Sequence, residues 1–171
     1  MAFVFGITGW KNSGKTTLTE KLVTELVARG WTVSTVKHAH HDFDIDKPGA
    51  DSFRHRQAGA TEVAIVSGRR WALMHELRGE DEPTLDDILA RLSPSDIVLV
   101  EGYKREAHKK IEARRLEAKD RTPLSTTDPN IVAVAADFTV EGEELPVFHL
   151  DDAKSIADFV ERSTGLVPRA K

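Results

Sequence analysis

Residues 6–17 read Gly-Ile-Thr-Gly-Trp-Lys-Asn-Ser-Gly-Lys-Thr-Thr, and this stretch decides the fold. Within it, Gly9 and Gly14 are separated by four residues and are followed at once by Lys15 and Thr16. In this pattern the glycines let backbone amides wrap around a polyphosphate, the lysine reaches the terminal phosphates, and the hydroxyl ligates Mg²⁺. The stretch therefore predicts a loop that binds the phosphates of a nucleotide.

The residues on either side of this loop have the order that such a loop requires. Residues 3–7 have the pattern of a short buried strand, and residues 16–29 carry apolar side chains at helical spacing. Within the loop, Lys11 adds charge near the phosphates, and Trp10 packs over the ligand or serves as hydrophobic cover. The nucleotide-binding residues predicted here are Gly9, Trp10, Lys11, Asn12, Ser13, Gly14, Lys15, Thr16 and Thr17.

The composition is that of a soluble globular protein, and we expect one nucleotide-binding domain over residues 1–171. With 24 Lys+Arg against 28 Asp+Glu, the net charge of −4 gives no long-range attraction for nucleic acid. The absence of cysteine excludes disulfides and thiolate metal sites. There is no apolar run of the roughly 18 residues that span a bilayer, and no signal-peptide pattern. We therefore expect a cytoplasmic protein without a membrane or nucleic-acid partner.

Strand and helix patterns alternate along the rest of the chain. Further strands are predicted at 31–36, 62–66, 71–74, 97–100, 131–135 and 147–150, and further helices at 51–59, 84–92 and 151–163. Residues 67–70 join two of these strands and indicate a hairpin. No strand is predicted in the highly charged stretch 104–120. This alternation predicts an α/β, P-loop NTPase-like fold with a mostly parallel sheet and helices on both faces.

Glu101 ends the apolar run 97–100, where a buried strand is predicted. In open parallel sheets ligands bind beyond the carboxyl ends of the strands. An acidic residue at that place can hold Mg²⁺ or orient a water beside the γ-phosphate. The alternative is a carboxylate that caps the strand or pairs with a lysine. We predict Glu101 as the catalytic residue and, with Thr16, as a metal-binding residue.

The segment 37–49 follows the second predicted strand and holds three His and three Asp within nine residues. Imidazole and carboxylate together suit several divalent metals. Loops at this place in phosphate-loop proteins also move with the nucleotide, so the same residues can contact phosphate or Mg²⁺. A solvated polar loop is the third interpretation. The ligand-contacting residues predicted from this segment are Lys37, His38, Asp44 and Asp46.

Two further features leave alternatives open. The basic run 104–115 fits a second anionic ligand or an acidic protein surface, and it equally fits a solvated loop. The Asn-Lys-x-Asp motif by which many GTPases read guanine does not occur. Asp137, after the strand 131–135, is a candidate guanine reader because a carboxylate accepts hydrogen bonds from the guanine N1 and N2 hydrogens.

Several segments together resemble the MobB family of molybdopterin-guanine dinucleotide biosynthesis adapter proteins. The resemblance covers most of residues 3–115 and is most distinctive where the His/Asp segment ends in Pro-Gly-x-Asp-Ser. The segments that carry it are 9–18, 37–52, 58–60, 70–74 and 99–104. The family's Lys-Ile-Glu-x-x-Arg segment is also present at 110–115, although His108 and Lys109 precede it where a proline is common. From Leu116 onward the resemblance is weak.

This resemblance implies a GTP-binding protein with weak GTPase activity. It also implies homodimerisation and work beside a MobA-type guanylyltransferase, as GMP is attached to molybdopterin, which makes molybdopterin a candidate ligand. GTP and Mg²⁺ are then the expected cofactors. Two other functions fit the same residues. A small-molecule kinase would use the basic run 104–115 as its lid, and a metallochaperone GTPase would use the His/Asp segment as its cargo site.

Overall fold

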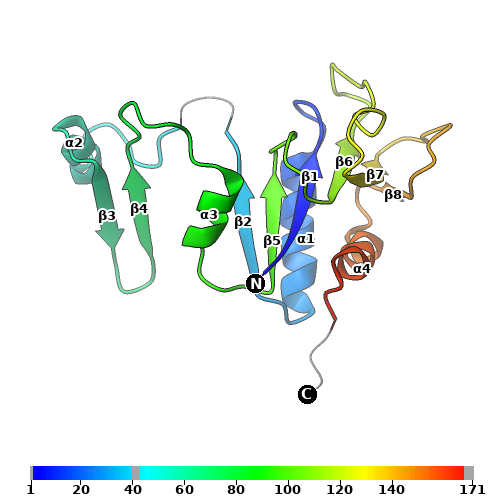
Figure 1. The fold of residues 1–171 in the computed structure, drawn as a ribbon, viewed down its shortest axis with the longest axis horizontal. Helices are drawn as coiled ribbons and strands as arrows, with labels where there is room; N and C mark the ends of the chain where they lie inside the picture. Colours follow the sequence, from blue (N-terminus) through cyan, green and yellow to red (C-terminus); the bar gives the residue numbers. More distant parts are fainter. Residues whose placement is uncertain (1, 40–42, 168–171) are drawn as a thin grey trace. The chain divides into compact units, whose positions relative to one another are not determined.

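The computed structural model describes residues 2–39 and 43–167, and the chain forms two compact units (Figure 1). The sheet unit comprises Met1–His38 and Ile88–Lys171, and the hairpin unit comprises Ala39–Asp87. The expectation of one nucleotide-binding domain over residues 1–171 stays a prediction. Among the described residues, no helix combines the length and the apolar character needed to cross a membrane.

The sheet unit is built on six strands, and every neighbouring pair in it is parallel. In spatial order these are β2 (Val33–Lys37), β5 (Ile97–Glu101), β1 (Phe3–Thr8), β6 (Lys110–Arg114), β7 (Ile131–Ala136) and β8 (Val147–His149) (Figure 1). The predicted α/β class and mostly parallel sheet are confirmed. Because Ile7, Glu101 and Lys37 lie in register across β1, β5 and β2, the residues after these strands share one edge of the sheet.

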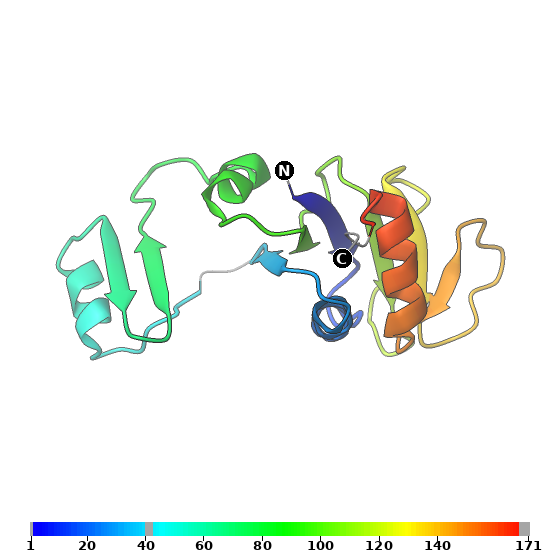
Figure 2. The ribbon, with the colours of Figure 1, turned by 90° about the horizontal axis from the view of Figure 1, so that it is seen from below.

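Two helices, α1 (Lys15–Ala28) and α4 (Ala153–Thr164), pack against each other and against β1 (Figure 2). Each helix presents apolar residues at helical spacing to the strands, which is why the pattern predicted both. Arg29, just after α1, bonds to Asp158 and Glu161 of α4 and holds the pair together. The fully buried residues of this core are Phe5, Ile7, Leu18, Leu22, Leu26, Ile97, Leu99, Ile111, Ala133, Ala135, Ile156, Ala157 and Val160.

Strand β6 lies within the charged stretch that received no strand from the sequence. Ile111 and Ala113 belong to the apolar core, whereas Lys110, Glu112 and Arg114 alternate with them and are buried as well. Polar partners make this possible: the Lys110 ammonium, for example, donates to the Lys104 carbonyl at 3.0 Å. Neither interpretation of the basic run, an anion-binding surface or a solvated loop, holds for residues 110–114, because they form a buried interior strand.

The hairpin unit contains α2 (Asp51–Gln57), β3 (Glu62–Val66) and β4 (Trp71–His75), and α3 (Leu85–Arg91) begins in it and continues into the sheet unit. Strands β3 and β4 pair antiparallel, and the Ser67 N–H donates to the Arg70 carbonyl at 2.9 Å. The predicted hairpin is therefore confirmed. Its larger apolar side chains are only partly covered, because Ile65, Val66, Trp71 and Leu73 are exposed while Val63 and Met74 are buried.

Candidate functional site

The phosphate loop, residues 9–14, joins β1 to α1, and its two glycines are required where they stand. Gly9 has a φ of 142°, and a Cβ there would overlap Ser13 Oγ and the Ala113 carbonyl. Gly14, with a φ of 93°, is the N-cap of α1 and makes no side-chain capping hydrogen bond. Because Gly14 has no side chain to cap them, the first backbone N–H groups of α1 are left for another acceptor. Uncapped N–H groups at a helix N-terminus form a binding site for anions.

Thr16 and Glu101, the two residues predicted to bind metal, are brought together although they are far apart in the sequence. Thr16 Oγ1 donates to Glu101 Oε1 at 2.8 Å, and Lys37 Nζ lies 3.3 Å from the same oxygen. Glu101 is 7% exposed. A hydroxyl and a carboxylate form an oxygen donor set that suits Mg²⁺, which takes one or two protein ligands and completes its shell with phosphates and water.

Lys15 interacts electrostatically with two other lysines and with Glu101. Its ammonium donates to the Trp10 carbonyl at 2.6 Å. Burial lowers the pKa of Lys15, with Lys104 and Lys37 lowering it further and Glu101 opposing them. A polyphosphate would supply the negative charge that this cluster lacks.

Trp10 connects the phosphate loop to the β6–β7 loop, residues 115–130. Its indole Nε1 donates to the Thr122 carbonyl at 2.7 Å, and the Lys104 ammonium lies 3.9 Å from the centre of a Trp10 ring. Lys11 and Asn12 are exposed, and Asn12 has a φ of 63°. The buried Ser13 Oγ has no hydrogen-bond partner among the described residues, and Thr17 is half-buried.

The predicted residues of segment 37–49 divide between the two units. In the sheet unit, the His38 N–H donates to the Glu101 carbonyl at 3.0 Å, and its ring lies 4.8 Å from the Tyr103 ring. In the hairpin unit, Arg56 binds the carboxylates of both Asp44 and Asp46. His40, His41 and Asp42 lie outside the described residues. Among those that are described, no group of three His, Cys, Asp or Glu is placed to hold a metal ion.

Asp137 follows β7 and holds the start of the β6–β7 loop. Its Oδ1 accepts a hydrogen bond from the Leu116 N–H at 2.9 Å. A second carboxylate, Glu112, has a similar role that was not predicted from the sequence. It accepts hydrogen bonds from the N–H groups of Leu124 and Ser125 at 2.9 and 3.0 Å. The signal that could have found it is the period-two alternation of apolar and charged residues through 110–114.

The sequence matches the family model described as molybdopterin guanine dinucleotide synthesis protein B over residues 4–137. The chain belongs to the MobB family. The matched residues run from β1 to Asp137 and so include the phosphate loop, Glu101 and β6. The family resemblance seen in the sequence is confirmed.

Relatives of the MobB family resemble this chain along most of its length. The molybdopterin-guanine dinucleotide biosynthesis adapter protein of Escherichia coli (strain K12) is 40% identical over 153 residues, which cover 88% of this chain and 87% of the relative. The protein of the same name from Haemophilus influenzae is 40% identical over 161 residues, 92% of this chain and 87% of that one. The crystal structure of a MobB protein homolog from Bacillus stearothermophilus has a TM-score of 0.70 at 34% identity, covering 96% of this chain and 99% of that one.

Proposed function

We propose that this MobB-family chain binds GTP with Mg²⁺ at the phosphate loop and acts as an adapter in the biosynthesis of molybdopterin guanine dinucleotide. The observation that carries the proposal is the Thr16–Glu101 hydrogen bond beside Lys15, at the start of α1. The adapter role is supported by the names of relatives that are 40% identical to this chain. We place this activity in the cytoplasm.

The residues present fit a magnesium nucleotide. The backbone N–H groups of the phosphate loop, together with Lys15 and Lys37, would bind the phosphates, and Thr16 and Glu101 would hold Mg²⁺. The metal ion, when bound, neutralises charge on the phosphates. In a weak hydrolysis reaction, Glu101 would also orient the attacking water.

A titration of GTP and ATP with and without Mg²⁺, followed by Trp fluorescence, tests this proposal because Trp10 lies inside the phosphate loop. We expect Mg²⁺-dependent binding with a preference for GTP. Lys15→Ala should weaken GTP binding by about 100-fold, since it removes a partly buried cation from the phosphates. Lys21→Ala is the matched control, because Lys21 lies on the same helix and pairs with Asp151. Unchanged GTP affinity in Lys15→Ala would overturn the proposed site.

We also propose that the chain works as a homodimer beside a MobA-type guanylyltransferase. The exposed apolar side chains of the hairpin, among them Trp71 and Leu73, support self-association. Light scattering should give twice the chain mass for the wild type and the single mass for Trp71→Ser/Leu73→Ser. Val27→Ser, an exposed valine on α1, is the control that should stay dimeric. A monomeric wild type would refute the homodimer.

The partnership with the guanylyltransferase has a separate test. Analytical ultracentrifugation of the two proteins together should show a complex, and Mg²⁺ with GTP should increase its population if the phosphate loop governs the adapter function. Lys15→Ala should then form the complex only as well as the nucleotide-free wild type does. Two proteins that sediment independently with and without GTP would contradict this part of the proposal.

A further inference from the structure

Lys104 lies in the loop that follows β5, and this loop brings its side chain to the phosphate loop. The two residues before it, Gly102 and Tyr103, have φ angles of 93° and 45°, and few residues other than glycine adopt such a positive φ. The Gly102 N–H donates to the Ile7 carbonyl at 3.1 Å and so ties this turn to β1. Beyond the turn, the Lys104 ammonium lies 3.9 Å from the centre of a Trp10 ring.

The backbone of Lys104 is anchored independently of its side chain. The buried Lys110 ammonium donates to the Lys104 carbonyl at 3.0 Å and pairs with Asp128 at 2.6 Å, so β6 holds this point of the loop. The stem of a lysine is flexible and has four carbons. The Lys104 ammonium can therefore move between neighbouring partners while the backbone around it stays in place.

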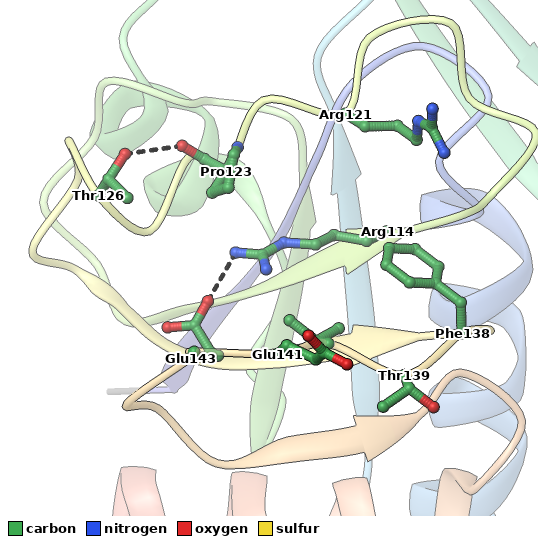
Figure 3. A pocket seen from close by; sticks show the side chains of 10 residues that line it. Arg114, Arg121, Pro123, Thr126, Phe138, Thr139, Glu141 and Glu143 are labelled. Atoms are coloured by element: carbon green, nitrogen blue, oxygen red, sulfur yellow. Dashed lines mark hydrogen bonds and ion pairs between the residues drawn. The ribbon is translucent and has the colours of Figure 1, made fainter.

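In the part of the chain that the structure describes, no carboxylate pairs with Lys104. Buried basic side chains of the same unit do have such partners. The Arg114 guanidinium, for example, points at the Glu143 carboxylate and pairs with it at 2.9 Å (Figure 3). The Trp10 ring attracts the Lys104 ammonium through its quadrupole but carries no net charge. Lys104 thus holds a positive charge that a bound anion would neutralise.

This charge lies at the end of the site where the terminal phosphates of a nucleotide would bind. The Trp10 carbonyl accepts from the Lys15 ammonium, and the lysine of a phosphate loop reaches the last two phosphates. Burial lowers the pKa of Lys15, and Lys104 lowers it further because the two cations repel each other. An ion pair with a phosphate oxygen is stronger than attraction to an aromatic face. A phosphate at this end would therefore draw the Lys104 ammonium away from the ring.

We propose that Lys104 binds the third phosphate and so distinguishes a nucleoside triphosphate from a diphosphate, an assignment that rests on the proposed GTP site. Without a nucleotide, the Lys104 ammonium lies on the Trp10 ring. When a triphosphate binds, the ammonium moves to an oxygen of the third phosphate. A diphosphate lacks that oxygen, so Lys104 stays on the ring. Because Lys110 holds the backbone, the change is confined to one side chain and to the surroundings of Trp10.

Calorimetric titration of GTP and of GDP, each with Mg²⁺, tests this preference. Lys104→Ala should weaken GTP binding by about tenfold, the effect of one hydrogen bond between charged groups, and GDP binding by about twofold or less. Lys104→Arg keeps the charge and should retain most of the preference for GTP. Lys109→Ala is the matched control, because Lys109 is exposed and its ammonium donates to the Ser163 carbonyl near the end of α4. This control should bind both nucleotides as the wild type does.

Fluorine NMR of the protein labelled with 5-fluorotryptophan follows the Trp10 ring directly. Trp10→Phe identifies the Trp10 resonance among those of the three tryptophans. In the wild type, the frequency of this resonance should differ between the GTP and GDP complexes, because Lys104 leaves the ring only in the first. In Lys104→Ala the difference should disappear.

The outcomes separate this role of Lys104 from the GTP site itself. If Lys104→Ala weakens both nucleotides equally, or weakens neither, the assignment is wrong and the GTP site stands. The same holds if the GTP and GDP complexes of the wild type give one and the same Trp10 resonance. If the wild type binds neither nucleotide, the proposed GTP site fails, and the role of Lys104 fails with it.

Discussion

The phosphate loop and β6 both place basic side chains inside the sheet unit, yet they use them in opposite ways. At the phosphate loop, the cations Lys15 and Lys37 face the carboxylate of Glu101, and Lys104 adds a third positive charge. In β6, Lys110 pairs with Asp128, and Arg114 pairs with two carboxylates. The proposed nucleotide site thus holds more positive than negative charge, whereas the buried charges of β6 are matched by partners within the protein.

The largest effect is expected from removing a buried carboxylate that pairs with a basic residue of β6. Glu112→Ala should lower the free energy of unfolding by about 4 kcal/mol, because it leaves Arg114 short of a carboxylate and two N–H groups without an acceptor. Urea-induced unfolding measures this change. Glu117→Ala, an exposed glutamate of the β6–β7 loop, should change stability by about 0.5 kcal/mol or less. A similar small loss in Glu112→Ala would show that the buried network is not structural.

At the phosphate loop the corresponding carboxylate should matter for turnover instead. Glu101→Gln should slow GTP hydrolysis by about 100-fold, the effect of losing a group that orients or deprotonates the attacking water. GTP affinity should change much less than turnover, because Lys15 and the loop amides remain. Single-turnover hydrolysis and a GTP titration measure the two effects separately. If turnover is unaffected while its Mg²⁺ dependence persists, another acid has this role.

His108, two residues before β6, extends the comparison to acid pH. Burial lowers its pKa to about 4, with Lys110 lowering it further and Asp128 opposing, and neither ring nitrogen has a hydrogen-bond partner among the described residues. The imidazole is protonated near pH 6.5 in the unfolded chain but only near pH 4 in the folded protein. Above pH 6.5 its titration therefore does not reduce the free energy of unfolding, which falls as the pH drops from 6.5 toward 4. After allowance for partial screening by solvent, the loss is about 2 kcal/mol.

The loss of stability caused by protonation of His108 is measured as the difference in unfolding free energy between wild type and His108→Leu at several pH values. The difference should change between pH 6.5 and 4 and stay constant above pH 7. His55→Leu, at an exposed position of α2, is the control and should show no such change. A pH-independent difference for His108→Leu would mean that the imidazole titrates normally.

The same contrast explains how much of the molecule was predictable from its sequence. The phosphate loop, its flanking strand and helix, and the hairpin were predicted because neighbours in the sequence carry their pattern. Strand β6 was missed since the groups that neutralise its charges come from residues that are distant in the chain, such as Asp128 and Glu143. A local window shows Lys, Glu and Arg there but not the partners that allow them to be buried.

The candidate site was likewise predictable in its parts and less so in its contacts. Glu101 could be placed at a strand end by pattern, and its hydrogen bond to Thr16 follows from the parallel sheet order. The ion pairs of Arg56 with Asp44 and Asp46 could not be foreseen, because Arg56 lies in α2, 10 residues or more along the chain from both carboxylates. The spacing of the carboxylates in segment 37–49 gave no indication of which basic side chain would bind them.

The smallest expected effect concerns the unmatched charge itself. Since burial and neighbouring cations lower the pKa of Lys15, raising the pH should neutralise its ammonium earlier than that of an exposed lysine. Bound phosphates favour the charged form, so GTP affinity should fall as the pH rises through that lowered pKa. Lys15→Arg keeps its charge at alkaline pH and should bind GTP with an affinity that does not fall as the pH rises. If GTP affinity fell equally with pH in both proteins, the titrating group would not be Lys15. Lys15 would then act through the geometry of its hydrogen bonds, and not through the excess of positive charge that distinguishes this loop from β6.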